Sequence, residues 1–182
     1  MIVEETNLKE VKVVIPDVHD DQRGYFFESY NSKSFETHLI PHHYLQDNEV
    51  KSKKSTLRGL HYQLNNPQGK LVRVVSGEIL DVAVDIRLGS PTFGKHVIKK
   101  LSSQNKRMLY VPEGFAHGYI VLSEESIVIY KCTNVWIPND EYGISWNDPS
   151  LAINWGNKYP VLSEKDLSLP MLKEQKELPT YK

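Results

Sequence analysis

The feature that most constrains the fold is a succession of short segments in which apolar and polar residues alternate. These segments follow one another along most of the chain: 11–16, 25–30, 44–48, 55–63, 70–75, 79–86, 95–101, 107–111, 118–122 and 126–132. Glycine, proline and asparagine separate them, and these residue types favour turns. Strands at a spacing of roughly ten residues are typical of an all-β sandwich or barrel. Nothing resembles the helices that alternate with strands in α/β proteins.

The chain contains no internal repeat, low-complexity stretch or linker. We therefore expect a single domain over residues 1–182, a length that can bury a sizeable core. Residues 32–38 favour one or two turns of helix. From about residue 163 the sequence has helical propensity but is interrupted by Pro170 and Pro179, so this tail is predicted to lie on the barrel.

Composition argues against several classes of partner. A formal net charge of −1 and an isoelectric point near 6.7 give no electrostatic reason to expect nucleic acid or an anionic membrane as a partner. No apolar run approaches the about 18 residues of a membrane span, and the acidic first residues lack the features of a signal peptide. The single cysteine, Cys132, excludes an internal disulfide framework and fits a reducing compartment. We expect a soluble cytoplasmic protein.

Residues 56–63 bring a guanidinium, a glycine and an imidazole together between Arg58 and His61. Arginine offers a planar, permanently charged group suited to phosphate, and histidine exchanges protons near neutral pH. Strand alternation places Arg58 on the face of Leu60 and His61 on the opposite face, where the imidazole would look into a polar cavity. The alternative is a surface histidine beside a solvated arginine.

Residues 79–86 form an apolar strand that carries two carboxylates, Asp81 and Asp85. Alternation puts both on the face opposite the valines, and a buried charge is costly unless it is paired. Asp85 lies near Arg87, so we interpret it as a strand-end carboxylate satisfied by its own loop. Asp81 lies further inside the strand, where it is either satisfied in the same way or faces a site.

A third segment presents His117 after the sequence Pro-Glu-Gly-Phe-Ala. Together with His61 it is similar to the two half-motifs of cupin barrels, which hold a metal through histidines and a carboxylate. Here Tyr62 and Gln63 follow His61, and the next candidate ligand is the cationic Lys70. Two separated histidines do not make a transition-metal site. The sequence therefore argues against a metal and for acid/base chemistry by imidazole.

Two further residues have ordinary local interpretations. Tyr130 lies beside Lys131 on an apolar strand, and it is either a half-buried strand tyrosine or, if suitably positioned, a general acid. Ser163 followed three positions later by an acidic residue is a helix-capping pattern. Local reasoning therefore interprets Asp166 as a capping group.

Taken in order, these motifs resemble the dTDP-4-dehydrorhamnose 3,5-epimerase family from about residue 10 to residue 170. The matching stretches are 21–24, 46–48, 57–63, 69–72, 81–87, 90–94, 112–118, 130–131, 146–149 and 162–166. The resemblance implies a cupin-like jelly-roll barrel with short peripheral helices that works as a homodimer without metal or cofactor. It also implies epimerisation at C3 and C5 of dTDP-4-dehydro-6-deoxy-D-glucose, giving dTDP-4-dehydro-L-rhamnose in dTDP-L-rhamnose biosynthesis.

The resemblance also implies catalytic roles for particular side chains. His61 would be the base, oriented by the carboxylate of Asp166. Tyr130 would be the acid on the opposite face of the sugar ring. Lys70 would stabilise the oxyanion at C4, a role that is often among the larger catalytic contributions.

Other residues match binding positions of the family. Arg58 would hold the pyrophosphate, and His117 with Asp81 is similar to the family's second histidine–aspartate pair in the pocket. The positions that match nucleotide-binding residues, some of them contributed by the partner subunit through an exchanged N-terminal strand, are Arg23, Phe26, Glu28, Gln46 and Asn48.

One departure concerns the sugar end of the site. Where the family commonly carries two tyrosines, the second near the sugar, this chain has Val135 and Trp136. We assign Trp136 to substrate binding, but tryptophan is bulkier and lacks the hydroxyl. A C3-only epimerase, or an epimerase of another 4-keto nucleotide sugar, therefore stays open as an alternative. The alternatives of other classes are a non-catalytic nucleotide-sugar-binding jelly roll and a metal-dependent cupin.

Overall fold

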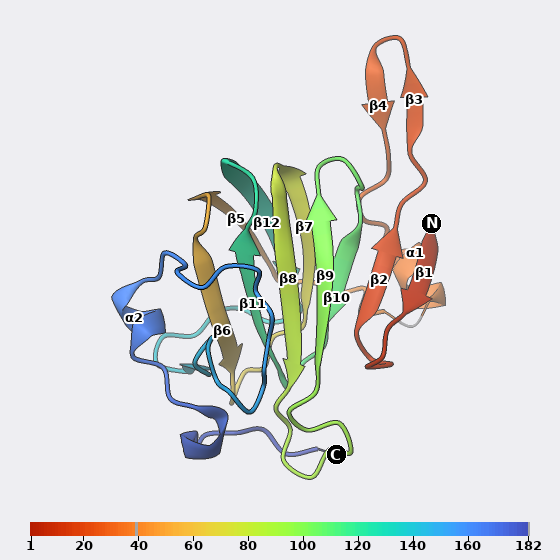
Figure 1. Cartoon of the computed structure of the whole chain (residues 1–182). Helices are drawn as coiled ribbons and strands as arrows, with labels where there is room; N and C mark the ends of the chain where they lie inside the picture. Colours follow the sequence, from red (N-terminus) through yellow and green to blue (C-terminus); the bar gives the residue numbers. More distant parts are fainter. Residues whose placement is uncertain (39, 182) are drawn as a thin grey trace.

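Strands dominate the computed structural model, which describes residues 1–38 and 40–181 (Figure 1). They are β1 (Ile2–Glu5), β2 (Lys12–Ile15), β3 (His19–Asp21), β4 (Gly24–Phe26), β5 (Gln46–Lys53), β6 (Leu57–Gln63), β7 (Lys70–Ser76), β8 (Glu78–Asp85), β9 (His96–Ser102), β10 (Met108–Val111), β11 (Phe115–Val121), β12 (Glu125–Cys132) and β13 (Glu141–Gly143). One sheet has the order β1-β2-β10-β7-β12-β5 and the other the order β13-β6-β11-β8-β9, while β3 and β4 form a separate hairpin. The predicted all-β, cupin-like jelly roll is confirmed.

Helices are few and short. α1 (Ser32–Thr37) begins after Asn31, whose side chain accepts hydrogen bonds from the first backbone N–H groups of the helix, and the predicted turns over residues 32–38 are confirmed. α2 (Glu164–Leu167) begins after Ser163, and a 3₁₀ turn follows at Leu172–Glu174. In the part of the chain that the structure describes, no helix is long and apolar enough to cross a membrane.

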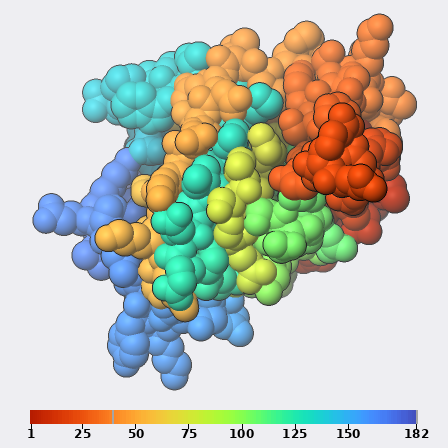
Figure 2. Space-filling view, turned by 90° about the horizontal axis from the view of Figure 1, so that it is seen from above, coloured from red at the N-terminus to blue at the C-terminus, as the bar shows by residue number. Residues whose placement is uncertain are grey.

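Strand alternation creates three apolar layers. The first lies between the two sheets, where Val72 and Val128 of one sheet pack with Ala83 and Phe115 of the other. The second covers the outer face of the five-stranded sheet with C-terminal residues, and the third covers the outer face of the six-stranded sheet with N-terminal residues. In Figure 2 the two chain ends accordingly cover opposite sides of the barrel. Each buried Val, Leu or Phe side chain contributes about 1.5–3 kcal/mol.

Some strands begin or end at other residues than the sequence predicts. The segment predicted to be extended over residues 25–30 pairs only up to Phe26, because the β3–β4 hairpin is exposed on every residue and finds no third strand. Conversely, β11 begins at Phe115 and β5 continues to Lys53, further than predicted. Both extensions lie where a neighbouring strand supplies partners, which a local pattern does not reveal.

Asp85 is satisfied by its own loop, as predicted. Its carboxylate accepts hydrogen bonds from the backbone N–H and guanidinium of Arg87 and from the hydroxyls of Ser90 and Thr92, at 2.6–3.0 Å. Burial by itself raises the pKa of Asp85, but these hydrogen bonds outweigh it and lower the pKa to about 2. The ionised form therefore anchors the loop after β8.

Strand β6 departs from simple alternation between Arg58 and His61. His61 pairs with His117 on β11 and Arg58 pairs with Tyr119, so three steps along β6 match two along β11. Gly59 lies at this irregularity with φ of 110°, and a Cβ there would lie 2.5 Å from the carbonyl oxygen of His117, which only glycine avoids. The prediction that Arg58 and His61 lie on opposite faces is wrong, because both line one cavity.

Candidate active site

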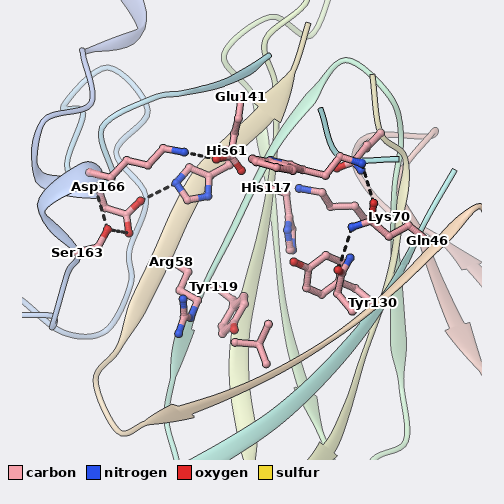
Figure 3. A pocket seen from close by; sticks show the side chains of 15 residues that line it. Gln46, Arg58, His61, Lys70, His117, Tyr119, Tyr130, Glu141, Ser163 and Asp166 are labelled. Atoms are coloured by element: carbon pink, nitrogen blue, oxygen red, sulfur yellow. Dashed lines mark hydrogen bonds and ion pairs between the residues drawn. The ribbon is translucent and has the colours of Figure 1, made fainter. Parts of the chain in front are cut away.

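A cavity of about 500 Å³ lies between the two sheets (Figure 3). Strands of both sheets and helix α2 supply its walls. The lining residues are Gln46, Asn48, Val50, Arg58, His61, Gln68, Lys70, His117, Tyr119, Tyr130, Trp136, Glu141, Ser163, Lys165 and Asp166. The cavity thus brings together most of the residues predicted from the sequence, although they come from segments more than 100 residues apart, such as His61 and Asp166.

His61 and Asp166 form a histidine–carboxylate pair in this cavity, with His61 Nε2 2.6 Å from Asp166 Oδ1. The other carboxylate oxygen of Asp166 accepts a hydrogen bond from Ser163 Oγ at 2.8 Å, and Ser163 Oγ also caps α2 by accepting one from the backbone N–H of Asp166. Burial raises the pKa of Asp166, but the hydrogen bond and charge of His61 outweigh it and keep the pKa below its usual value. An ionised Asp166 fixes the ring of His61.

A second histidine–carboxylate pair lies beside the first. His117 is the direct neighbour of His61 across β6 and β11, and its Nε2 lies 2.7 Å from Asp81 Oδ1 on β8. Asp81 is fully buried and is not among the residues that line the cavity, so it meets the site through its contact with His117, and its assignment to substrate binding stays a prediction. Its other oxygen, Oδ2, has no hydrogen-bond partner among the described residues.

Lys70 and Tyr130 reach the cavity from the opposite sheet, on the neighbouring strands β7 and β12. Figure 3 shows them on the side of the cavity across from His61. Burial lowers the pKa of the Lys70 ammonium, and burial also raises the pKa of Tyr130 to about 12. The phenol therefore stays protonated, and able to donate, over the whole neutral range.

Polar side chains complete both ends of the cavity. Arg58 donates to Ser52 Oγ at 3.1 Å through Nε, which leaves the two terminal guanidinium nitrogens for an anion. At the other end, Gln46 donates to Asn48 Oδ1 at 3.0 Å and accepts a hydrogen bond from the backbone N–H of Trp136 at 2.7 Å. Trp136 forms part of the wall with about half of its surface exposed.

Comparison with known proteins agrees with this geometry. The family model of dTDP-4-dehydrorhamnose 3,5-epimerase matches residues 5–174. The chain belongs to this family. Its relatives include the dTDP-4-dehydrorhamnose 3,5-epimerase of Salmonella typhimurium, which is 51% identical over 94% of this chain and 96% of that protein.

Two solved structures of the family bear on the site. The dTDP-6-deoxy-D-glucose-3,5-epimerase of Legionella pneumophila, solved with dTDP-4-keto-L-rhamnose, is 45% identical and superposes with a TM-score of 0.96 over 100% of this chain and 98% of that one. A 3′-monoepimerase of Streptomyces bikiniensis, solved with dTDP-quinovose, is 31% identical with a TM-score of 0.91 over 97% of this chain and 92% of that one. The chain is therefore similar both to a protein named as a 3,5-epimerase and to one named as a 3′-monoepimerase.

Three residues that match nucleotide-binding positions of the family lie outside the cavity. Arg23 and Phe26 belong to the β3–β4 hairpin and Glu28 follows it, and the hairpin projects away from the barrel (Figure 1). The Arg23 side chain is 90% exposed and forms an ion pair with Asp21 of its own turn. Within one chain these residues do not contribute to the cavity.

Some residues of the cavity wall have no role that the sequence predicts. Tyr119 lies two positions after His117 on β11, so strand alternation could have placed it on the same face. Lys165 of α2 forms an ion pair with Glu141 of β13. The pairing of these two residues could not be found locally, because β13 has only three residues and the contact joins distant segments.

Metal ligands do not gather in this site. Over residues 1–38 and 40–181, no group of three or more His, Cys, Asp and Glu side chains is arranged to hold a metal ion. His61 and His117 instead each direct a ring nitrogen toward a carboxylate. That arrangement holds each imidazole in one orientation, which suits acid/base chemistry.

Proposed function

We propose that this chain epimerises C3 and C5 of dTDP-4-dehydro-6-deoxy-D-glucose, giving dTDP-4-dehydro-L-rhamnose for dTDP-L-rhamnose biosynthesis. The observation that carries the proposal is the placement of an oriented imidazole and a protonated phenol on opposite walls of one cavity. His61 with Asp166 stands on one wall and Tyr130 on the other, next to Lys70. Inversion of a carbon centre requires such an arrangement, because the proton must leave one face and return to the other.

The chemistry starts from the ketone at C4, which acidifies the hydrogens on C3 and C5. His61 removes such a proton, and ionised Asp166 stabilises the imidazolium that forms. The electrons move onto the C4 oxygen, where the ammonium of Lys70 stabilises the enolate. Tyr130 then donates its proton to the opposite face of the carbon. Arg58 holds the pyrophosphate by charge-assisted hydrogen bonds.

The second candidate within the same class is an epimerase that inverts C3 only. Trp136 favours it, because the indole occupies cavity wall and has no hydroxyl to offer the sugar. The likeness to a 3′-monoepimerase supports keeping this candidate. A binding module without catalysis is less well supported, since binding a nucleotide sugar requires neither the His61–Asp166 pair nor the half-buried Lys70.

Oligomeric state and location belong to the proposal as well. We infer a single-domain jelly roll that acts as a homodimer, with the β3–β4 hairpin of one protomer carrying Arg23, Phe26 and Glu28 to the cavity of its partner. The exposure of the hairpin supports this inference, since Phe26 is 72% exposed. A cytoplasmic location is proposed from the single cysteine, which is free and buried.

The proposal is tested by incubating the chain with the dTDP-4-keto-6-deoxy sugar in deuterium oxide and following C3 and C5 by proton NMR. Incorporation at both carbons with inversion supports the 3,5-epimerase. Incorporation at C3 alone identifies the C3-only enzyme. Tight binding of dTDP without exchange at either carbon would identify a binding module and contradict the proposal. Metal analysis of the same preparation tests the metal-dependent alternative.

A further inference from the structure

Gln63 is a buried polar residue that the proposed chemistry does not use. It ends β6, two residues after His61, and only 3% of its surface is exposed. Its amide group leaves the strand and contacts the loop after β12. Nε2 donates to the carbonyl oxygens of Asn66 at 2.7 Å and Val135 at 3.2 Å, and Oε1 accepts from the backbone N–H of Ile137 at 2.7 Å. The amide therefore holds this loop on both sides of Trp136.

Two other amide side chains hold the same loop. Asn66 donates through Nδ2 to the carbonyl oxygen of Val135 at 2.8 Å, and Gln46 accepts from the backbone N–H of Trp136 at 2.7 Å. Residues 135–137, here called the strap, are thus bound at three consecutive positions. Gln63 belongs to the five-stranded sheet and Gln46 to the six-stranded sheet, so the strap bridges the two walls of the cavity.

The strap lies at the end of the cavity that contains His61 and Lys70. Gln63 follows His61 on β6, while Gln46 is paired to Cys132 on β12, which is paired in turn to Lys70. Arg58 lies on the other side of His61 along the same strand. Among the strap residues only Trp136 lines the cavity, and its backbone is fixed. Its indole is therefore a wall whose position the amides determine.

We propose that Gln63 is a positioning residue that holds Trp136 as a wall and thereby sets the ratio of reaction at C5 to reaction at C3. This inference rests on the proposed function. One imidazole and one phenol serve two carbons on either side of C4, so the sugar must present each carbon to them in turn. When Trp136 is held rigidly, it limits the orientations that the sugar can adopt. When Trp136 is mobile, the populations of these orientations change.

The test compares the wild-type chain with Gln63→Leu and Asn66→Ala. Leucine removes all three hydrogen bonds of Gln63, whereas Asn66→Ala removes one bond at a more exposed position that does not endanger folding. Asn7→Ala is the matched control, because Asn7 Nδ2 makes a single bond to the carbonyl oxygen of His96 at 3.1 Å outside the cavity. The readouts are deuterium incorporation at C5 relative to C3, the Kd for dTDP, and fluorine NMR of fluorotryptophan-labelled protein.

The chain has three tryptophans, and the spectrum of Trp136→Phe assigns the resonance of Trp136. In Gln63→Leu and Asn66→Ala we expect this resonance to shift or broaden and the C5 to C3 ratio to change by about fivefold or more, with the Kd for dTDP within about twofold of wild type. Asn7→Ala should match wild type in every readout. If Gln63→Leu does not fold, Gln63→Glu takes its place with the same expected results, because its carboxylate still accepts from the backbone N–H of Ile137 but loses both hydrogen bonds that Gln63 Nε2 donates.

An unchanged Trp136 resonance in both variants would overturn the inference, because the strap would then not depend on these amides. A changed resonance with an unchanged C5 to C3 ratio would overturn it as well, since the wall would then not govern the outcome. Absence of exchange at both carbons in the wild-type chain is a different result. It would refute the proposed function, while the resonance of Trp136 would still decide whether Gln63 holds the strap.

Discussion

Among single residues, Lys70 and Tyr130 lie on neighbouring strands, and burial shifts their pKa values in opposite directions. Burial disfavours the charged form of each, so it lowers the pKa of Lys70 and raises that of Tyr130 to about 12. Lys70 therefore loses its proton at a lower pH than an exposed lysine does. At that pH the hydroxyl of Tyr130 is still protonated. The activity should fall on the alkaline side when Lys70 becomes neutral, not when Tyr130 ionises.

Lys70→Arg tests this assignment. Arginine keeps its charge at all accessible pH values, so the alkaline limb of kcat/KM should move up by about one pH unit or more. The peak value should drop roughly tenfold, because the guanidinium does not reproduce the geometry of the ammonium. The measurement is a pH profile of solvent exchange into substrate. An alkaline limb that stays in place would contradict the role of Lys70.

The sequence predicted the placement of individual residues best where these residues belong to a motif of the family. His61, Lys70, Tyr130 and Asp166 were predicted together and do line one cavity, although local patterns made Asp166 only a capping group. Ser163 rather than Asp166 caps α2, and the Asp166 carboxylate contacts Ser163 Oγ and His61 Nε2 instead. Alternation alone misplaced Arg58, because a register irregularity at Gly59 depends on its partner strand β11.

Among the secondary-structure elements, α2 is the most dependent on one side chain. The helix has four residues, too few to be stable without its cap and its contacts. Ser163 supplies the cap and also contacts Asp166 Oδ2. The orientation of the proposed catalytic pair, His61 and Asp166, thus depends on a hydroxyl that does not touch His61.

Ser163→Ala should lower the stability by about 1 kcal/mol, as the loss of a helix cap does. It should also lower kcat by about tenfold with little effect on KM, because Asp166 loses one of the bonds that orient it. Thermal unfolding and steady-state kinetics measure the two effects. Ser163→Thr, which keeps the hydroxyl, should restore both. A kcat equal to wild type in Ser163→Ala would show that the cap does not orient the pair.

The strands were predictable to different extents. Strand β8 has nearly the predicted limits because its alternation is strong, with Val82 and Val84 in one apolar layer and Ala83 in the other. Strands β1 and β13 were not predicted. They have four and three residues, and they form only because β2 and β6 offer edges to pair with. Such elements depend on the neighbouring strand rather than on their own sequence.

For the molecule as a whole, the β3–β4 hairpin is the element that links the fold to the proposed homodimer. The order of the strands in each sheet depends on contacts between distant segments. The alternation pattern therefore predicts strands but does not predict how they are arranged. Every residue of β3 and β4 is exposed, and the Arg23 side chain pairs with Asp21 of its own turn. In the proposed homodimer the hairpin would complete the neighbouring cavity.

Mixing two weakened variants tests the exchange. Arg23→Ala removes a hairpin residue and His61→Ala removes the base, so each homodimer should be nearly inactive. In a mixed dimer one of the two cavities combines an intact hairpin with an intact base, so mixed dimers isolated through both tags should show about half of the wild-type activity. Co-expression with two affinity tags provides the mixed dimers. Mixed dimers without activity would contradict the exchange, as would an unimpaired Arg23→Ala.

In the proposed mechanism, His61 removes a proton from one face of the carbon and Tyr130 returns a proton to the other face. The most direct measurement follows deuterium in both substrate and product after incubation of wild type, His61→Ala and Tyr130→Phe in deuterium oxide. His61 lies on the cavity wall, so His61→Ala should fold normally and show no exchange at C3 or C5. Tyr130→Phe should still exchange hydrogen through His61 but return it to the same face, which gives labelled substrate and at least about 10²-fold less inverted product. Full exchange in His61→Ala, or undiminished inversion in Tyr130→Phe, would contradict the account.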